Sequence, residues 1–294
     1  MSAVPSSSEI GSSGGPKARR RMSTGQRILF FVTAWLIVLM PFLFWWNTWF
    51  GRQLSDKQLS EYLHDDKKPR HIQHALVQIG ERMSRHDASV TRWYPDVARL
   101  ASYPVEEVRN TDAWVMGEDT SVADFHEALL KMRNDSSLMV RGNAALSLVR
   151  FGDATGRPQI VQLLQPIQIL APGGGEIMDT STAGTSIRQG GVIAKLEVNW
   201  NYDDINRVDV RSPAAGRVRT ISVRARQQVH QGDVIAVLDP ATEQVWEALR
   251  ALYLIGKPED IPVIQSYERD LPDIPAHVRQ QAIETEKAIR QREK

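Results

Sequence analysis

The sequence predicts an α+β protein in which one N-terminal transmembrane helix precedes a short α-solenoid that carries an inserted all-β unit. Three observations support this fold class. Residues 28–50 form an uncharged apolar run, residues 54–166 and 241–294 have helical periodicity, and residues 167–240 state one β-type pattern twice. Residues 1–27, which precede them, are predicted to be a disordered basic tail.

The composition describes a foldable chain and excludes several classes of function. The 294 residues are 42% hydrophobic and 24% charged. The 36 Lys and Arg nearly balance the 35 Asp and Glu, so the chain has no large net positive charge that would attract nucleic acid. We therefore expect no nucleic-acid partner. The chain has no cysteine, which excludes disulfides, thiol nucleophiles and thiolate metal sites.

The apolar run at 28–50 predicts a single membrane crossing. Its 23 uncharged residues are enough to cross the ~30 Å hydrocarbon layer as a helix. The run is too long for a typical signal peptide, and no small-x-small cleavage site follows it. Basic residues gather before it, at Lys17, Arg19, Arg20, Arg21 and Arg27. The positive-inside bias then predicts a bacterial inner-membrane protein with a cytoplasmic N-terminus and a periplasmic body.

A second pattern recurs in the helical stretches. An apolar residue and an arginine are followed three to four positions later by a small or apolar pair, in Val108-Arg109, Val140-Arg141 and Val278-Arg279. Such spacing predicts one helical face that packs closely on a neighbour. Several of these helices are expected to stop at a glycine, namely Gly80, Gly117, Gly152 and Gly256.

These stretches resemble HEAT repeats, particularly SSLMVRGNAALSLVRFGD and AHVRQQAIETEKAI. The resemblance implies helix pairs at 54–166 and 241–294 that stack directly on one another or across the β unit. It also implies a structural role for Arg109, Arg141 and Arg279, as arginines that bond the preceding turn or a neighbouring acid. Ligand recognition by these arginines is the alternative.

The β-type pattern of 167–240 consists of a proline, two spaced glycines and apolar strand residues. The first copy of the pattern runs from Pro172 through Gly175 and Gly190, and the second copy from Pro213 through Gly216 and Gly232. A glycine in such a position allows a turn with positive φ or a close approach of two backbones. A β sequence that repeats itself this closely predicts two interlocked halves.

The paired motifs APGGGEI and SPAAGRV, each completed by RQGGVIAKL or HQGDVIAVL, resemble the biotinyl/lipoyl domain and the barrel-sandwich hybrid of HlyD-type membrane-fusion proteins. A carrier domain needs a lysine at the tip of its hairpin, where this chain has Asp204 and Ile205. Lys195 lies inside a predicted strand. The long α-helical hairpin of the adaptor family is missing as well. The resemblance therefore implies a small rigid β module used for docking.

The chain carries no zincin, Walker, GxSxG or GxGxxG motif, so we predict no enzyme activity, no catalytic residue, no cofactor and no metal. His71 and His74, with Asp65 and Asp66 upstream, have a spacing that metal ligands on a helix can have. A charged, solvated helix end is the simpler interpretation, and we favour it.

The hairpin at 197–209 supplies the candidate partner-binding residues. These are Trp200, Tyr202, Asp203 and Asp204. Aromatic residues dominate interface hot spots, so a hairpin tip of this composition is typical of a docking patch. The alternative is that one of the aromatic side chains packs back on the helices.

We therefore expect a membrane-anchored, non-catalytic scaffold or accessory subunit that docks to or stabilises a larger inner-membrane complex. Its expected partners are other membrane-complex subunits or an inner-membrane transporter, and the lipid bilayer through residues 28–50. A shortened HlyD-like adaptor of a transport or efflux system is the alternative. A biotin or lipoyl carrier that uses Lys195 is the third hypothesis.

Overall fold

The computed structural model describes residues 24–49, 53–201 and 204–293, and the chain divides into two units, Met1–Gln53 and Leu54–Lys294. The described part of the first unit is dominated by one helix, α1 (Thr24–Trp49), with Pro41 inside it. The predicted disordered tail lies outside the described residues up to position 23, and residues 24–27 belong to the helix.

The transmembrane prediction is corrected by the structure. A helix that crosses a bilayer needs about 20 consecutive apolar residues. In the parts of the chain that the structure describes, no helix has both the length and the apolar character for such a crossing. The prediction rested on the length and the missing charges of 28–50, whereas α1 ends at Trp49, includes Thr24-Gly25-Gln26-Arg27 before the apolar run and contains a proline. The inner-membrane localisation, the orientation and the bilayer contact inferred from that segment are withdrawn with it.

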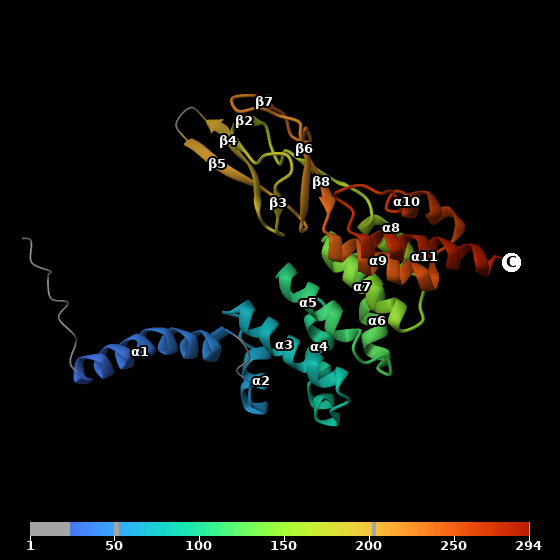
Figure 1. The fold of residues 1–294 in the computed structure, drawn as a ribbon. Helices are drawn as coiled ribbons and strands as arrows, with labels where there is room; N and C mark the ends of the chain where they lie inside the picture. The colour runs from blue at the N-terminus through green and yellow to red at the C-terminus, as the bar shows by residue number, and fades with distance from the viewer. Residues whose placement is uncertain (1–23, 50–52, 202–203, 294) are drawn as a thin grey trace, which may run out of the picture. The chain divides into compact units, whose positions relative to one another are not determined.

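Within Leu54–Lys294 the main helices form two rows (Figure 1). The first row, here called the stack, is made of α3 (Pro69–Ser84), α5 (Glu106–Met116), α7 (Leu138–Arg150), α9 (Thr242–Ile255) and α11 (Ala276–Arg292). Each stack helix packs on the next, and each also contacts a helix of the second row. That row is made of α2 (Asp56–Leu63), α4 (Tyr94–Leu100), α6 (Ala123–Met132), α8 (Arg157–Leu163) and α10 (Ile261–Gln265), with the 3₁₀ turns η1 (Ala88–Trp93) and η2 (Pro258–Asp260).

The hydrophobic core of the helical part includes residues from before and after the β insertion. One cluster of buried residues fills the space between α2 and α7 and includes Trp93 and Phe125. A second cluster joins Ile160 and Leu163, which precede the strands, to Val245 and Leu249, which follow them. The helices on the two sides of the insertion therefore pack directly on each other, through α7, α8 and α9.

The strands form two four-stranded antiparallel sheets between α8 and α9. The first sheet has the order β1-β8-β6-β3 and the second β5-β4-β2-β7. The strand bounds are β1 (Ile167–Leu170), β2 (Gly175–Thr180), β3 (Ser186–Ile187), β4 (Val192–Asn201), β5 (Asp204–Arg211), β6 (Gly216–Ile221), β7 (Gln228–Val229) and β8 (Val234–Pro240). Each strand of the first sheet corresponds to the strand of the second sheet that occupies the same place in the other repeat: β1 to β5, β8 to β4, β6 to β2 and β3 to β7. Each repeat therefore contributes strands to both sheets, and the halves interlock as the repeat predicts.

The hydrogen bonds at the repeat junctions also occur in pairs. Gly190 N–H donates to the Ser212 carbonyl at 2.8 Å, and in the other half Gly232 N–H donates to the Ala171 carbonyl at 2.9 Å. Both glycines have positive φ, +73° and +90°. The other two repeated glycines, Gly175 and Gly216, have the second role expected of glycine, which is to allow a close approach of two backbones. A Cβ added at Gly175 would lie 2.2 Å from the Glu197 carbonyl oxygen, and one added at Gly216 would lie 2.1 Å from that of Asp239.

The barrel-sandwich expectation is wrong, because the described strands make two open sheets and no closed barrel. Closure requires the edge strands of one sheet to pair with those of the other. The edge strands β3 and β7 are only two residues long, so each pairs with its own sheet and continues no further. One shared hydrophobic cluster instead joins the sheets, with Ile177 and Leu196 from one and Val218 and Ile235 from the other.

Candidate partner-binding site

A groove of about 790 Å³ crosses the stack helices α5, α7, α9 and α11, and we call it the stack groove. Its apolar lining comes from Trp114 on α5, Leu146 on α7, and Tyr253 and Leu254 on α9. Because α7 and α9 are separated in sequence by the strands, the groove exists only through the packing of the helices across the insertion.

Three large side chains in this groove are unusually exposed for their type. Trp114 is 40% exposed, Tyr253 43% and Leu254 61%. Scattered exposed apolar residues are normal on a protein surface, but a group of them in one concavity is typical of a binding surface. Tryptophan and tyrosine in particular concentrate binding energy at protein interfaces.

The position of Trp114 depends on a glycine in the neighbouring helix. Gly80 is buried inside α3, and a Cβ added there would lie 3.1 Å from the indole ring of Trp114 and 3.2 Å from the side chain of Val115. The expectation that Gly80 ends a helix is therefore wrong. The residue is small because α5 lies against it, whereas Gly117 and Gly256 do follow helix ends and Gly152 has a positive φ of 77°.

The floor of the groove is held by polar contacts between stack helices. The Ser147 hydroxyl on α7 donates to the Ala113 carbonyl on α5 at 2.8 Å, and the Asn143 amide donates to Asn110 Oδ1 at 2.9 Å. A Cβ at Gly117 would lie 2.5 Å from Ser147 Oγ, so the close approach of Ser147 requires a residue without a side chain at position 117. A platform held in this way presents its side chains in fixed positions.

The charged residues of the groove are paired within the protein. Arg150 makes two hydrogen bonds to the Glu118 carboxylate, at 2.6 and 3.0 Å. Arg250 lies 3.3 Å from Glu247 and has its guanidinium 4.7 Å from the ring centroid of Trp246. The groove therefore combines an apolar strip with charges of both signs.

The arginines singled out in the sequence make the structural contacts expected of them. Arg109 donates to both carboxylate oxygens of Asp135, at 2.7 and 2.9 Å, and to the Tyr103 carbonyl at 2.8 Å. Arg141 donates to the carbonyls of Asp135 at 2.7 Å and Ser136 at 3.0 Å. Arg279 forms an ion pair with Asp270. Each arginine binds the turn before its helix or an acid near it.

The predicted hairpin residues are only partly described. Trp200 lies on β4 and Asp204 begins β5, in a hairpin where Asn201 pairs with Asp204, but their side chains lie outside the described part. Tyr202 and Asp203 lie outside the described residues altogether. The docking patch stays a prediction.

The other candidates from the sequence have local partners. Nδ1 of His71 lies 2.8 Å from Asp65, and Nε2 of His74 lies 2.8 Å from the amide nitrogen of Gln78. Among the described residues, no three His, Cys, Asp or Glu side chains are grouped to hold a metal. Lys195 lies in β4, opposite Asp179 and Asp209, rather than at a hairpin tip.

Two carboxyl groups, those of Asp112 and Glu268, have raised pKa values that sequence reasoning did not find. Asp112 on α5 is fully buried, neither of its oxygens has a hydrogen-bond partner in the described structure, and burial raises its pKa well above the ordinary range. Burial, together with the hydrogen bond and the charge of Glu286, raises the pKa of Glu268 to about 7.

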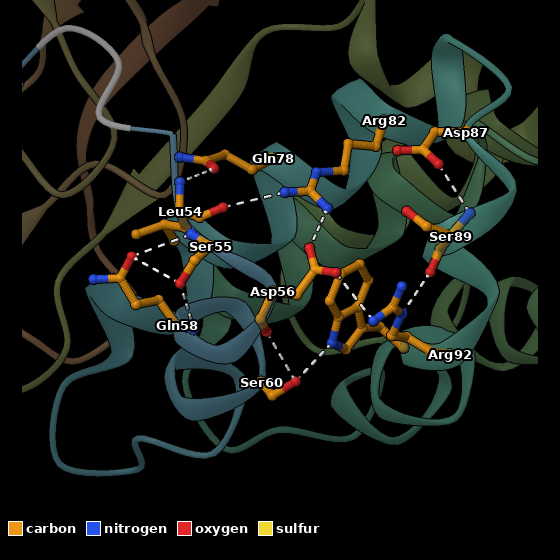
Figure 2. Close-up of polar contacts among 11 residues, drawn as sticks. Leu54, Ser55, Asp56, Gln58, Ser60, Gln78, Arg82, Asp87, Ser89 and Arg92 are labelled. Carbon is orange, nitrogen blue, oxygen red and sulfur yellow. Dashed lines mark hydrogen bonds and ion pairs between the residues drawn. The ribbon is translucent and has the colours of Figure 1, made fainter.

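A polar network fixes the beginning of the second unit (Figure 2). Asp56 accepts a hydrogen bond from Arg82 at 2.8 Å and lies 3.0 Å from Arg92, and both guanidinium groups lie over the ring of Trp93, at 5.5 and 5.0 Å. The hydrogen bond from Arg82 lowers the pKa of Asp56. The Trp93 indole donates to Ser60 at 2.9 Å. These contacts join α2, α3 and η1, so the network is structural.

Comparison with known proteins identifies no family. No protein-family model matches the chain, and no curated protein matches it. Among solved structures, three examples share limited similarity with the chain. They are a single-chain, multi-domain long-chain acyl-CoA carboxylase (19% identity, TM-score 0.23, 35% of this chain and 10% of that one), an engineered protein (15%, 0.38, 80% of each) and an aspartoacylase family protein from Mesorhizobium loti (13%, 0.23, 48% of this chain and 51% of that one). All three TM-scores are too low to carry an argument about fold or function.

Proposed function

We propose that this protein is a non-catalytic scaffold that binds a segment of a partner protein in the stack groove. The observation that carries the proposal is the exposure of Trp114, Tyr253 and Leu254 in one concavity of about 790 Å³. Such a volume accommodates several side chains, and a partner segment with apolar residues would remove these three from water. The absence of catalytic motifs in the sequence is in keeping with this function.

The proposal includes the HEAT-like character of the helices. Stacked helix pairs offer extended surfaces on which a partner can lie across several repeats. The contacts of Arg109 and Arg141 with the turns before their helices support this relationship. The β4–β5 hairpin, with Trp200 and Tyr202, is the second contact surface that we propose.

Site-specific photocrosslinking tests the location of the partner. A benzoylphenylalanine residue is placed at Leu254 in the groove, and in a matched chain at Met178 on β2, which is also exposed and apolar but lies outside the groove. The crosslinked species from cells that make the protein are digested and sequenced by mass spectrometry.

The proposal expects one protein segment to be enriched at position 254 and absent at position 178. Substitution of Tyr253 by Ser in the Leu254 crosslinking chain should reduce that crosslink at least several-fold, since an aromatic anchor is removed. Equal crosslinking from both positions, or a crosslink yield at position 254 that Tyr253→Ser leaves unchanged, would contradict binding in the groove.

A further inference from the structure

A second cavity, which we call the junction pocket, lies between the strands and the C-terminal helices of Leu54–Lys294. Its volume is about 1120 Å³. One wall comes from the β3 and β6 region, and the other from α9 and the segment 266–275. This volume is somewhat larger than the roughly 300–1,000 Å³ of small-molecule sites, so a ligand of drug size fits within it.

The wall formed by 266–275 is anchored to the start of the β insertion. The Tyr267 hydroxyl donates to the Leu164 carbonyl at 2.6 Å, across 103 residues of sequence. Burial raises the pKa of Tyr267 to about 12, so this hydroxyl keeps its proton and remains a donor throughout the physiological range. The pocket thus has one wall fixed to the connection that enters the strands.

Four arginines line the junction pocket, and they differ in how they are bonded. Arg219 forms an ion pair with Asp239, and Arg217 lies 3.9 Å from Asp273. Arg188 follows β3 and Arg269 belongs to the segment 266–275; their backbone carbonyls accept hydrogen bonds from Gly191 and Leu271, but in the described structure their guanidinium groups have no acidic or hydrogen-bonding partner. Two guanidinium groups on opposite walls are therefore free to bind a ligand.

The lining of the junction pocket also includes large apolar side chains. Ile187 lines the pocket from the strand side, Leu271 and Ile274 line it from the segment 266–275, and Leu271 is 46% exposed. One further charge lies there, Glu243 in the first turn of α9, which has no described partner. A ligand that suits this lining has an apolar body and an anionic group for the guanidinium donors.

We propose that the junction pocket binds a small amphiphilic anion, a carboxylate or phosphate ester with an apolar body, through Arg188 and Arg269. The anion accepts hydrogen bonds from the two guanidinium groups while its apolar part covers Ile187 and Leu271. Because its walls come from the strands and from the helices, occupancy would also hold these two parts together. This site is separate from the stack groove and does not depend on the proposed function.

Calorimetric titration of the full chain with octanoate tests the proposal, with octan-1-ol as the uncharged comparison. We expect octanoate to bind at least tenfold more tightly than octan-1-ol. Arg188→Gln and Arg269→Gln should each weaken octanoate about tenfold and leave octan-1-ol unchanged. Glu243→Gln should strengthen octanoate, because it removes a repelling charge from the lining.

The matched control is Arg224→Gln, since Arg224 is also an exposed arginine without a side-chain acidic partner but lies outside the pocket. It should bind octanoate as the unchanged protein does. Equal affinity for octanoate and octan-1-ol would overturn the proposal, as would Arg188→Gln and Arg269→Gln chains that bind octanoate normally.

Chemical modification gives a readout that needs no variant. Phenylglyoxal modifies accessible arginines, and peptide mass spectrometry reports each site separately. Octanoate should slow the modification of Arg188 and Arg269 several-fold and leave the rate at Arg224 unchanged. Protection of Arg224 to the same extent, or no protection at all, would refute the assignment.

Discussion

The two close-contact glycines of the β repeat give the sharpest prediction about stability. In Gly216→Ala the new methyl carbon would lie 2.1 Å from the Asp239 carbonyl oxygen and 2.9 Å from Leu238 Cγ. Carbon and oxygen atoms rarely approach closer than about 3 Å, so β8 must move by roughly 1 Å. One residue earlier, at Leu238, β8 pairs with β6 on one side and with β1 on the other, so it cannot move alone.

The magnitude follows from two opposing effects. Overpacking by one methyl group typically costs about 1–3 kcal/mol, and a weakened strand hydrogen bond adds about 1 kcal/mol. Replacing glycine by alanine restricts the unfolded chain, which returns about 0.4–1 kcal/mol. We therefore expect Gly216→Ala to destabilise the β unit by about 2–3 kcal/mol. Gly175→Ala should cost about the same, since its Cβ would lie 2.2 Å from the Glu197 carbonyl oxygen.

Native-state hydrogen exchange of the amides in β6 and β8 measures this local free energy without requiring the whole chain to unfold at once. The control is Gly173→Ala, because a Cβ at Gly173 meets nothing within 4 Å. Protection should fall about 30-fold or more in Gly216→Ala and stay nearly unchanged in Gly173→Ala. If the two variants differed by less than about 0.5 kcal/mol, the close backbone approach at Gly216 would be refuted.

Three further predictions concern charged groups in the helices. Arg109→Leu should cost about 3 kcal/mol in urea unfolding, because it leaves the largely buried Asp135 carboxylate without its cationic partner, and a loss below 1 kcal/mol would contradict this role. Asp112→Asn should stabilise the protein more at pH 8 than at pH 5. The raised folded pKa of this acid makes the unchanged protein lose stability as pH rises above about 3.8, and a pH-independent difference would count against an unpaired buried carboxyl. Glu268→Gln should remove a loss of stability between about pH 4.5 and 7. In that range the folded pKa of about 7 makes the native state hold more protons than the unfolded state, and identical pH profiles would contradict the burial of Glu268 beside Glu286.

The sequence predicted the β topology better than its closure. The paired glycines and prolines indicated two interlocked halves, and the sheet orders and the paired junction hydrogen bonds confirm them. The structure has no closed barrel among the described strands, because closure depends on the length of the edge strands. The repeated sequence pattern does not specify that length. In β3 and β7 only two residues pair, too few to join the sheets edge to edge.

The stack groove could not have been predicted in the same way. Trp114 and Leu254 are 140 positions apart, and they meet only because α7 and α9 pack across the inserted strands. A partial signal was present in Gly80, a buried glycine in the middle of a helical pattern. It was interpreted as a helix end because an apolar residue followed by glycine is common there. Its actual role is to leave room for the indole ring of Trp114.

The contacts of Arg109 were predictable because they are local. Its partners Tyr103, Pro104 and Asp135 lie in the turns beside its own helix and the next one along the chain. The buried position of Asp112 was not predictable, since an acid within a helical repeat is usually expected on a solvated face. Only the packing of α5 between its neighbours removes this carboxyl from water.

Affinity of the partner segment that photocrosslinks at position 254 is the measurement that bears most directly on the scaffold function. The segment is synthesised and titrated against the unchanged chain, Leu254→Ser, and Met178→Ser as a control of similar exposure. The account predicts that Leu254→Ser raises the Kd at least tenfold, while Met178→Ser leaves it unchanged. Equal Kd values for all three chains would contradict binding in the stack groove.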